Sequence, residues 1–398
     1  MKQFLVVCSM KVVIHAVAFL VCAFHGLQAA DTVRICTYNA LKYSAQNEDG
    51  RNVHFRRVLD SIQPDILICQ EVDDASLGVR FLTDVMTWTP FTASPFIDGP
   101  DTDNQILFDQ SKFTFLGQRR IPTSLRDIAE FTLATMPTDG TDPDTIVIYS
   151  VHLKASNDDA SAAQRTSEIR RLVTSITANR YAIVAGDFNI YAPQEQAYTA
   201  LVGNSAVRRF VDPIGTSWVR NDRAYASFYT QCTRKTTLGS CGGGVDGGVD
   251  DRFDYILISE ELAPRVVPGS YTAFGNDGVP RLNDAIDEPT NQRVSAAMAA
   301  ALKCASDHLP VYVDVIIGDV QASVEGAEQL TPWIRLQGTT LVVDDVQDKS
   351  VAMLYDINGR MCMETVLQGP TARIDAGSLL PGVYALRLGS RWASFVMP

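Results

Sequence analysis

Positive charge is scarce in this sequence of 398 residues. Lys and Arg together number 34, whereas Asp and Glu number 46, so the formal net charge is −12. This balance argues against a protein that coats nucleic acid through a basic surface. It does not exclude an enzyme that cuts nucleic acid, because a carboxylate-rich metal site adds to the same negative total. With 46% hydrophobic residues, the chain can build one large globular domain and a smaller one.

Zinc-binding cysteine pairs are also missing where cysteines lie closest together. Cys232 and Cys241 share the Gly-rich stretch QCTRKTTLGSCGGG, but neither has a CxxC partner. Their proximity predicts a disulfide between Cys232 and Cys241 in an exported protein. Cys36 and Cys69 lie inside apolar runs, and we expect them to be buried thiols.

A largely apolar stretch from Val12 to Phe24 follows two lysines and precedes the small residues Ala29 and Ala30. This order is typical of a secretory signal peptide, so we predict a signal peptide over residues 1–30 and a secreted or cell-surface protein. An uncleaved membrane anchor is the alternative, although His15 interrupts the stretch and its length is short for a membrane span. A lipoprotein anchor at Cys22 is disfavoured by the bulky residue before it. We therefore expect no stable membrane anchor.

Internal repeats and long low-complexity tracts are absent, and the rest of the chain divides into two regions. From residue 31 to 318, short runs rich in Val, Ile and Tyr alternate in places with helical patterns, which predicts an α/β or α+β domain of sheets covered by helices. We expect a linker over residues 319–335. Residues 336–398 show no helical pattern, and Asn358-Gly359 and Pro381-Gly382 are turn signals, so they predict a small all-β domain.

Polar residues stand at or just past the ends of the apolar runs in the first region. A single Asn or Asp in such a place usually forms a turn or a cap, and a single His is usually structural. Together they suit a site for a divalent cation, because carboxylate and amide oxygens are ligands that Mg²⁺ prefers. A glycosidase would use two of the carboxylates but would leave the histidines and asparagines unexplained. The residues are Asn39, Glu71, His152, Asp187, Asn189, Asp254, Asp307 and His308.

Six motifs in order, TYNAL, PDILICQEV, YSVHLKAS, GDFN, DRFDYILIS and SDHLPV, resemble the endonuclease/exonuclease/phosphatase superfamily of DNase I-like phosphoesterases. The resemblance implies a four-layered αββα sandwich with the site at one mouth. It also implies a divalent metal, Mg²⁺ with Mn²⁺ or Ca²⁺ as alternatives, held by Glu71 and Asp307 with Asn39 close by.

The same resemblance assigns roles to the remaining residues. Asp187 would orient or deprotonate the attacking water, and Asn189 would donate to the phosphoryl oxygens. His308, paired with Asp254, would contact the phosphate and assist proton transfer, and His152 would bind a phosphate oxygen from the other side. These groups suit hydrolysis of a phosphate ester by in-line attack of water.

The substrate is a weaker inference. The stretch HLKAS followed by QRTSEIRRL is more similar to the nuclease-type members of the superfamily than to its inositol-phosphate enzymes. We therefore expect nucleic acid as the substrate. A lipid or sugar-phosphate phosphoesterase and a non-catalytic binding module are the alternatives. The basic residues of this stretch could contact phosphate, but a solvated helix face is the favoured interpretation for Lys154, Arg165, Arg170 and Arg171.

Two further segments carry an expectation. The Gly-rich stretch with Asp246, Asp250 and Asp251 could hold a second cation, but it lacks the spacing of a calcium loop, so we favour a flexible loop.

The tail, with VAMLYDINGRM and LLPGVYALRL, resembles the C-terminal sorting domain of type IX secretion cargo. This resemblance implies export through the type IX secretion machinery. A plain accessory β-domain or a carbohydrate-binding module is the alternative, and we expect a monomer.

Overall fold

The computed structural model describes residues 31–48, 50–136, 143–176, 181–204, 206, 208–317, 333–344, 346, 349–356, 361–377, 379, 382–388 and 391–397. The predicted signal peptide, nearly all of the predicted linker and the Asn358-Gly359 turn lie outside the described residues. Within the described residues, no helix has the length and apolar character needed to cross a membrane.

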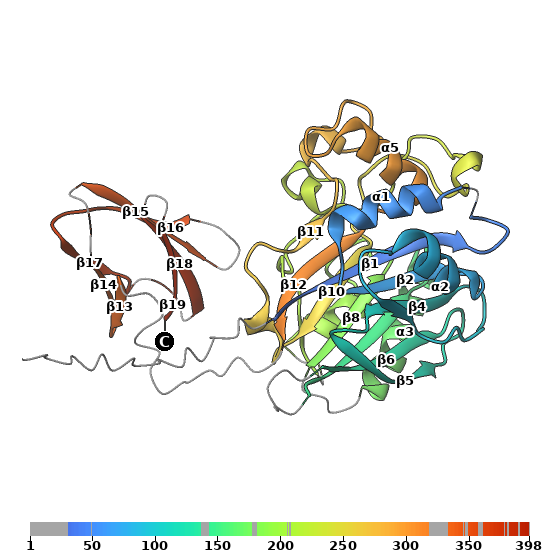
Figure 1. The fold of residues 1–398 in the computed structure, drawn as a ribbon, viewed down its shortest axis with the longest axis horizontal. Helices are drawn as coiled ribbons and strands as arrows, with labels where there is room; N and C mark the ends of the chain where they lie inside the picture. Colours follow the sequence, from blue (N-terminus) through green and yellow to red (C-terminus); the bar gives the residue numbers. More distant parts are fainter. Residues whose placement is uncertain are drawn as a thin grey trace, which may run out of the picture.

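Two six-stranded sheets form the larger part of the fold (Figure 1). The first has the order β11-β12-β1-β2-β4-β3, and the second has the order β5-β6-β7-β8-β10-β9. The strands of the first sheet are β1 (Asp31–Tyr43), β2 (Ile66–Val72), β3 (Phe91–Ala93), β4 (Asp103–Asp109), β11 (Thr272–Ala273) and β12 (Val311–Ile317). Those of the second are β5 (Phe113–Ile121), β6 (Ile128–Thr135), β7 (Thr145–His152), β8 (Tyr181–Asp187), β9 (Phe210–Val211) and β10 (Asp254–Ser259).

The central strands are apolar on both faces, which is why their sequences are nearly continuous hydrophobic runs. Ile35 and Ile183 point into the core between the two sheets. Their neighbours point the opposite way, because successive side chains of a strand alternate. Cys36 belongs to an outer core on the first sheet, and Val184 belongs to an outer core on the second.

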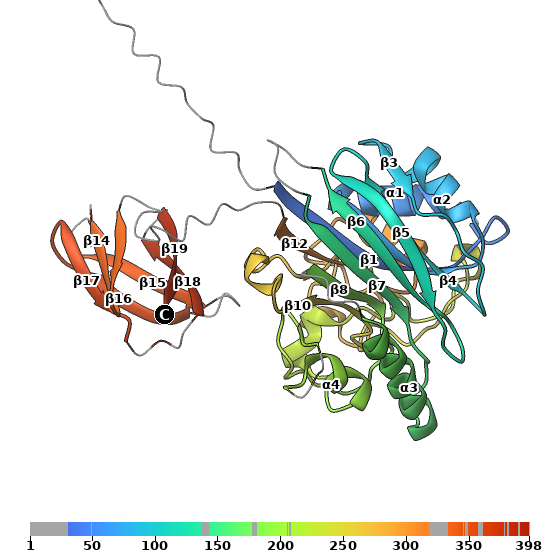
Figure 2. The same ribbon diagram turned by 90° about the horizontal axis from the view of Figure 1, so that it is seen from below.

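Helices cover both outer faces and complete four layers (Figures 1 and 2). The helices α1 (Asn52–Ile62), α2 (Ser76–Arg80) and α5 (Ala296–Ala305), with the π-helical turn η1 (Phe81–Val85), pack on the first sheet. The helices α3 (Asp159–Ser175) and α4 (Gln196–Val202) pack on the second. Side-chain caps begin two of them, because Asp158 accepts from the N–H of Ser161 and Ser295 accepts from that of Met298. The predicted αββα sandwich is confirmed.

The described parts of the long connections contain four short 3₁₀ turns and a few isolated β-bridges. The turns are η2 (Arg223–Phe228), η3 (Gly239–Cys241), η4 (Ala263–Arg265) and η5 (Val279–Arg281).

The C-terminal region forms two small antiparallel sheets with a core of their own, as the sequence predicts. One has the order β13-β14-β17 and the other has the order β16-β15-β18-β19. Leu341 and Ile374 of the first and Leu354 and Leu386 of the second share one apolar cluster. The strands are β13 (Ile334–Gln337), β14 (Thr340–Asp344), β15 (Ser350–Asp356), β16 (Met361–Leu367), β17 (Thr371–Asp375), β18 (Gly382–Leu388) and β19 (Arg391–Met397). The domain boundaries drawn from the sequence stay a prediction.

The predicted disulfide between Cys232 and Cys241 is wrong. Cys241, in η3, is bonded to Cys304 of α5, which lies 63 residues further along the chain, and Cys232 is a free, buried thiol. Closeness in sequence does not orient two side chains toward each other. The sulfur of Cys232 instead accepts from the backbone N–H of Gly248 at 3.2 Å. The predicted buried thiols Cys36 and Cys69 are confirmed.

Candidate active site

Three polar side chains stand in a row at one edge of the second sheet. His152 ends β7 and is the parallel partner of Asp187, which ends β8. Asp254 begins β10 and is the antiparallel partner of the same Asp187. The row depends on Gly186, whose φ is +135° and at which a Cβ would overlap the carbonyl oxygen of Val151. A strand order of β7-β8-β10 is therefore enough to bring the three side chains together.

The first sheet contributes Asn39 from β1 and Glu71 from β2, which are neighbouring parallel strands. The β-ladder is irregular beside both residues, and such irregularities redirect side chains. Glu71 has a left-handed backbone with φ of +54°. Non-glycine residues adopt this conformation at a cost of about 1–3 kcal/mol and do so mostly at functional sites.

Asn39 connects the two sheets through its side-chain amide. Its Nδ2 donates to Glu71 Oε1 at 3.0 Å and to Asp187 Oδ2 at 3.2 Å. Asn39 is fully buried, so these bonds are protected from water. A buried amide that donates to two carboxylates holds them close despite their like charge.

His152 faces the same two carboxylates. Its Nε2 lies 3.5 Å from Asp187 Oδ2 and 3.8 Å from Glu71 Oε1. Burial, together with the positive charge of Arg126 and of His308, holds the pKa of His152 well below its ordinary value. A neutral imidazole can donate from one nitrogen and accept at the other. Its Nδ1 is buried and has no hydrogen-bond partner within the described part of the chain.

His308 forms a close pair with Asp254. Its Nδ1 lies 2.8 Å from Asp254 Oδ2, and its Nε2 lies 3.6 Å from Asp187 Oδ2. Burial by itself lowers the pKa of His308, but the charges of Asp254 and Asp187 outweigh burial and hold the pKa well above its ordinary value. The two carboxylates therefore favour the cationic form of the buried imidazole.

The two carboxylates at the centre are less acidic than usual. Burial raises the pKa of Asp187 to about 7, and the charge of His308 opposes that rise. Burial and the negative charge of Asp307 raise the pKa of Glu71. A carboxylate with a pKa near neutrality is suited to accepting a proton.

Asp307 and Asn189 complete the set predicted from the sequence. Asp307 Oδ2 accepts from the N–H of Val245 at 2.8 Å, whereas its Oδ1 is buried and, among the described residues, has no hydrogen-bond partner. Asn189 donates its N–H to Asp187 Oδ1 at 3.0 Å and its Nδ2 to the carbonyl of Leu153 at 3.2 Å. All eight predicted residues thus belong to one connected or electrostatically coupled region.

Most of the chain matches one protein family. Residues 36–308 match the Endonuclease/Exonuclease/phosphatase family, which is well over half of the chain. The chain belongs to this family. A comparison with curated proteins found no match.

Solved structures with a similar fold have low sequence identity to this member of the Endonuclease/Exonuclease/phosphatase family. TDP2 from D. rerio, in complex with a single-strand DNA product, is 20% identical, with 71% of this chain and 98% of that chain covered and a TM-score of 0.47. Truncated TDP2 from Caenorhabditis elegans is 17% identical, with 72% and 98% covered and a TM-score of 0.46. The human Nocturnin catalytic domain with bound sulfate is 18% identical, with 71% and 92% covered and a TM-score of 0.41.

The donors of the site fit a divalent cation. Ligand atoms of Glu71, His152 and Asp187 all lie within 4.8 Å of one another. The pair Glu71 and Asp307, expected from the resemblance, is an alternative, because Asp307 Oδ1 is a buried acceptor with no other partner in the described structure. Mg²⁺ prefers oxygen ligands, which favours the two carboxylates, whereas Mn²⁺ also accepts the nitrogen of His152.

Two residues of the site escaped the sequence analysis. Arg126, in the turn between β5 and β6, donates to the carbonyl of Leu153, and its charge acts on His152 and Glu71. The side-chain amide of Gln231 lies against His308, with Nε2 atoms 2.6 Å apart. A cationic imidazole donates from both nitrogens, so the amide oxygen suits this place better, and the two ends of an amide are interchangeable. Neither residue lies directly at the end of an apolar run, so no sequence signal marked them.

The basic residues after His152 are only partly solvated. Arg170 and Arg171 are exposed, as expected. Arg165 is buried, in contrast to the expectation: its Nε lies 2.8 Å from Glu195 Oε2, and its Nη1 donates to the carbonyl of Lys154. A buried guanidinium needs such partners. Arg165 therefore supports the turn after His152.

The Gly-rich stretch has backbone order of its own. Gly243 donates to Leu238 O, and Gly248 donates to Arg234 O. Asp251 is paired with Arg220, and burial raises the pKa of Asp250 to about 6. Within the described residues, these acids do not join a group that could hold a metal.

Proposed function

We propose that this protein is a secreted, divalent-metal-dependent phosphodiesterase that hydrolyses extracellular DNA or RNA. The observation that carries the proposal is a buried carboxylate between two histidines: Asp187, with a pKa of about 7, lies 3.6 Å from Nε2 of His308 and 3.5 Å from Nε2 of His152. A carboxylate with a pKa near the working pH, beside groups that can donate protons, is suited to general acid–base catalysis. The family includes endonucleases, exonucleases and phosphatases, which supports the reaction class.

The proposed reaction begins with a water molecule that donates a hydrogen bond to Asp187. The water oxygen attacks phosphorus in line with the leaving oxygen, and its proton passes to Asp187. The bond from phosphorus to the leaving oxygen breaks, and the leaving oxygen keeps the electron pair and takes a proton from solvent. His308 donates to a phosphoryl oxygen as negative charge develops there, and Asp254 fixes its orientation from the other nitrogen. Asn189 and His152 can donate to the remaining oxygens.

A divalent cation held by Glu71 and Asp307 would neutralise developing negative charge on the phosphate. Asn39 keeps Glu71 in place through the hydrogen bond to Oε1. The raised pKa of Glu71 fits this role, because burial and the charge of Asp307 destabilise its carboxylate more than the charges of His308 and Arg126 stabilise it.

A substrate panel tests this proposal. Full-length protein stripped with EDTA and resupplied with Mg²⁺ or Mn²⁺ is incubated with single- and double-stranded DNA, RNA, sphingomyelin, inositol phosphates and a phosphomonoester. We expect cleavage of nucleic acid that needs the metal and that falls at least about a hundredfold in Asp187→Asn and His308→Ala. Asp60→Asn, an exposed carboxylate of α1, is the matched control. If the protein cleaves only a lipid or sugar phosphate, that compound and not nucleic acid is the substrate. If it hydrolyses nothing, a binding module is favoured.

Export by the type IX route is proposed on the resemblance of the tail. The described strands from β13 to β19 form sheets separate from the catalytic ones, which is compatible with a removable sorting domain. Intact-mass measurement of secreted protein decides the matter: loss of residues 1–30 and of the C-terminal domain supports the proposal, and retention of the C-terminal domain favours an accessory module.

A further inference from the structure

A loop of the protein touches the predicted metal ligand Asp307. Residues 239–249, here called the glycine loop, place the N–H of Val245 2.8 Å from Asp307 Oδ2. At Gly244, with φ of +85°, a Cβ would lie 2.8 Å from the same oxygen. Only glycine permits this close approach of backbone to carboxylate. The position of the glycine loop therefore decides where the second oxygen of Asp307, the unpartnered Oδ1, points.

Among the interactions that hold the glycine loop in place, two act at Cys241 and Gly243, next to the contact with Asp307. The disulfide from Cys241 to Cys304 attaches it to α5, and Cys304 lies three residues before Asp307 in the chain. The buried guanidinium of Arg234 donates to the carbonyls of Cys241 and Gly243. The disulfide thus joins the segment that carries Asp307 to the loop that contacts its carboxylate.

We propose that the disulfide between Cys241 and Cys304 positions Asp307 for metal binding, so that the site reaches full affinity for a divalent cation only after oxidation. This inference rests on the proposed function, in which Asp307 holds the cation. Forming the bond removes two electrons and two protons from the two thiols, and an external disulfide takes them up and becomes two thiols. Export to an oxidising compartment would supply that oxidant. A nuclease of this kind would stay weak in the reducing cytosol and gain activity outside.

A purely structural disulfide would behave differently. It would raise the free energy of unfolding by constraining the unfolded chain and would leave the affinity for metal unchanged. Metal affinity in the folded protein therefore separates the two interpretations, and no substrate is needed to measure it.

The first experiment measures the Kd of Mn²⁺ by titration calorimetry on the full chain. It compares the oxidised parent, the parent reduced with a phosphine, and the variant C241S/C304S. The phosphine gives two electrons to the disulfide, two thiols form with protons from water, and the phosphine leaves as its oxide. We expect the Kd to rise about tenfold in the reduced parent and in the variant, equivalent to about 1.4 kcal/mol. The variant should not respond to the phosphine, because the remaining described cysteines are free thiols.

A second pair of variants tests the same contact with the disulfide intact. Gly244→Ala forces a methyl group against Asp307, whereas Gly243→Ala, with φ of +77°, meets nothing within 4 Å. Both alanines carry the strain of a left-handed backbone, so they differ mainly in the contact with Asp307. We expect Gly244→Ala to raise the Kd of Mn²⁺ about tenfold and Gly243→Ala to leave it within about twofold of the parent.

The outcomes separate this inference from the proposed function. A parent that binds no Mn²⁺ overturns both. A parent that binds Mn²⁺, together with reduced protein and Gly244→Ala that bind it equally well, overturns the role of the disulfide and leaves the proposed function standing. If C241S/C304S fails to fold by circular dichroism, the Gly244→Ala and Gly243→Ala pair decides the inference. Weaker binding in Gly244→Ala alone supports it, and equal binding in the pair rejects it.

Discussion

His308 and Asp254 form a buried pair in which the imidazole Nδ1 lies 2.8 Å from the carboxylate Oδ2. Asp254 begins β10, whereas His308 comes just before β12, so the pair joins the two sheets. Both side chains are at most 2% exposed. Their partnership leaves Nε2 of His308 directed at Asp187, the residue proposed to accept the proton of water.

Replacing Asp254 by Asn should impair catalysis without removing the imidazole. The Asn amide cannot stabilise a cationic ring as the carboxylate does, so we expect kcat to fall about 10²- to 10⁴-fold. Because Asp254 acts through His308, the KM should change by less than about threefold. Steady-state kinetics on the preferred substrate measures both. A fall in kcat/KM that comes entirely from KM would show that Asp254 has a different role.

Asn39→Asp should lower the free energy of unfolding when no metal is present. The change removes the donor between Glu71 and Asp187 and adds a third buried acid, so we expect the free energy of unfolding to drop by about 1–3 kcal/mol in EDTA. Added Mn²⁺ should restore part of the loss, because a cation neutralises the acids. Urea denaturation with EDTA and with Mn²⁺ measures the difference.

Asn52→Asp provides the matched control for that prediction. Asn52, on α1, also donates to two carboxylates, Glu48 at 3.3 Å and Asp84 at 3.4 Å, but lies outside the candidate site. The substitution Asn52→Asp should lower the free energy of unfolding by the same amount with and without Mn²⁺. Equal rescue of both variants by Mn²⁺ would contradict a metal site at Asn39.

The layers and most of the site could be predicted because strand ends are visible in sequence. A buried strand is an apolar run, and a polar residue that follows it lies at the edge of a sheet. His152 and Asp187 end such strands, and Asp254 stands at the beginning of one. The strand order that makes them neighbours comes from tertiary packing, which the family resemblance supplied and periodicity alone does not.

The wrong predictions and the missed residues share one physical cause. In each case the side chain contacts a segment that is distant in the chain. Cys304 lies 63 residues from its partner, so local spacing favoured Cys232 instead. Arg165 has the sequence context of an exposed helix, but its turn meets Glu195 beyond the next strand. Arg126 and Gln231 reach the site from connections, where no periodic pattern marks a direction.

Gly186→Ala should strongly destabilise the fold. A methyl group there would overlap the carbonyl oxygen of Val151, and the φ of +135° is itself unfavourable for alanine. We expect the free energy of unfolding to fall by more than about 3 kcal/mol, or the protein to be insoluble. Gly117→Ala is the control, because φ is +153° and nothing lies within 4 Å. The free energy of unfolding of Gly117→Ala should fall by only about 1–2 kcal/mol. An equal fall in both variants would reject the steric argument.

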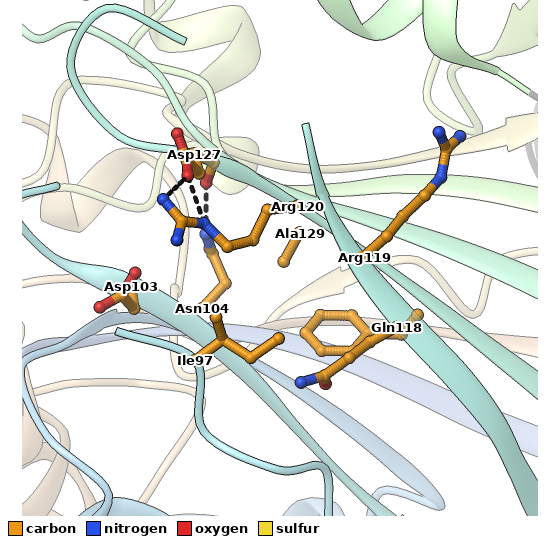
Figure 3. Close-up of a pocket in the computed structure, with 9 residues that line it drawn as sticks. Ile97, Asp103, Asn104, Gln118, Arg119, Arg120, Asp127 and Ala129 are labelled. Carbon is orange, nitrogen blue, oxygen red and sulfur yellow. Dashed lines mark hydrogen bonds and ion pairs between the residues drawn. The ribbon is translucent and has the colours of Figure 1, made fainter. Parts of the chain in front are cut away.

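Asp103 should make the stability of the protein depend on pH. It lines a small pocket with Arg120 and Asp127, which pair with each other (Figure 3). Burial raises the pKa of Asp103 from 3.8 to about 6, although the N–H of Gly99 donates to it. The folded state therefore holds the proton more tightly than the unfolded state. Its contribution to stability is fully present below about pH 4 and is lost as the pH rises through about 6.

Asp103→Asn should remove this dependence. The free energy of unfolding of the variant, relative to the parent, should rise between pH 4 and pH 7 by about 1 kcal/mol, because water at the pocket screens the charge. The Asn oxygen can still accept from Gly99, so the local hydrogen bond is kept. Urea denaturation of both proteins at each pH gives the difference, and Asp60→Asn, exposed on α1, controls for loss of one negative charge. If the free energies of unfolding of the parent and of Asp103→Asn change equally with pH, then folding does not disfavour the ionised form of Asp103.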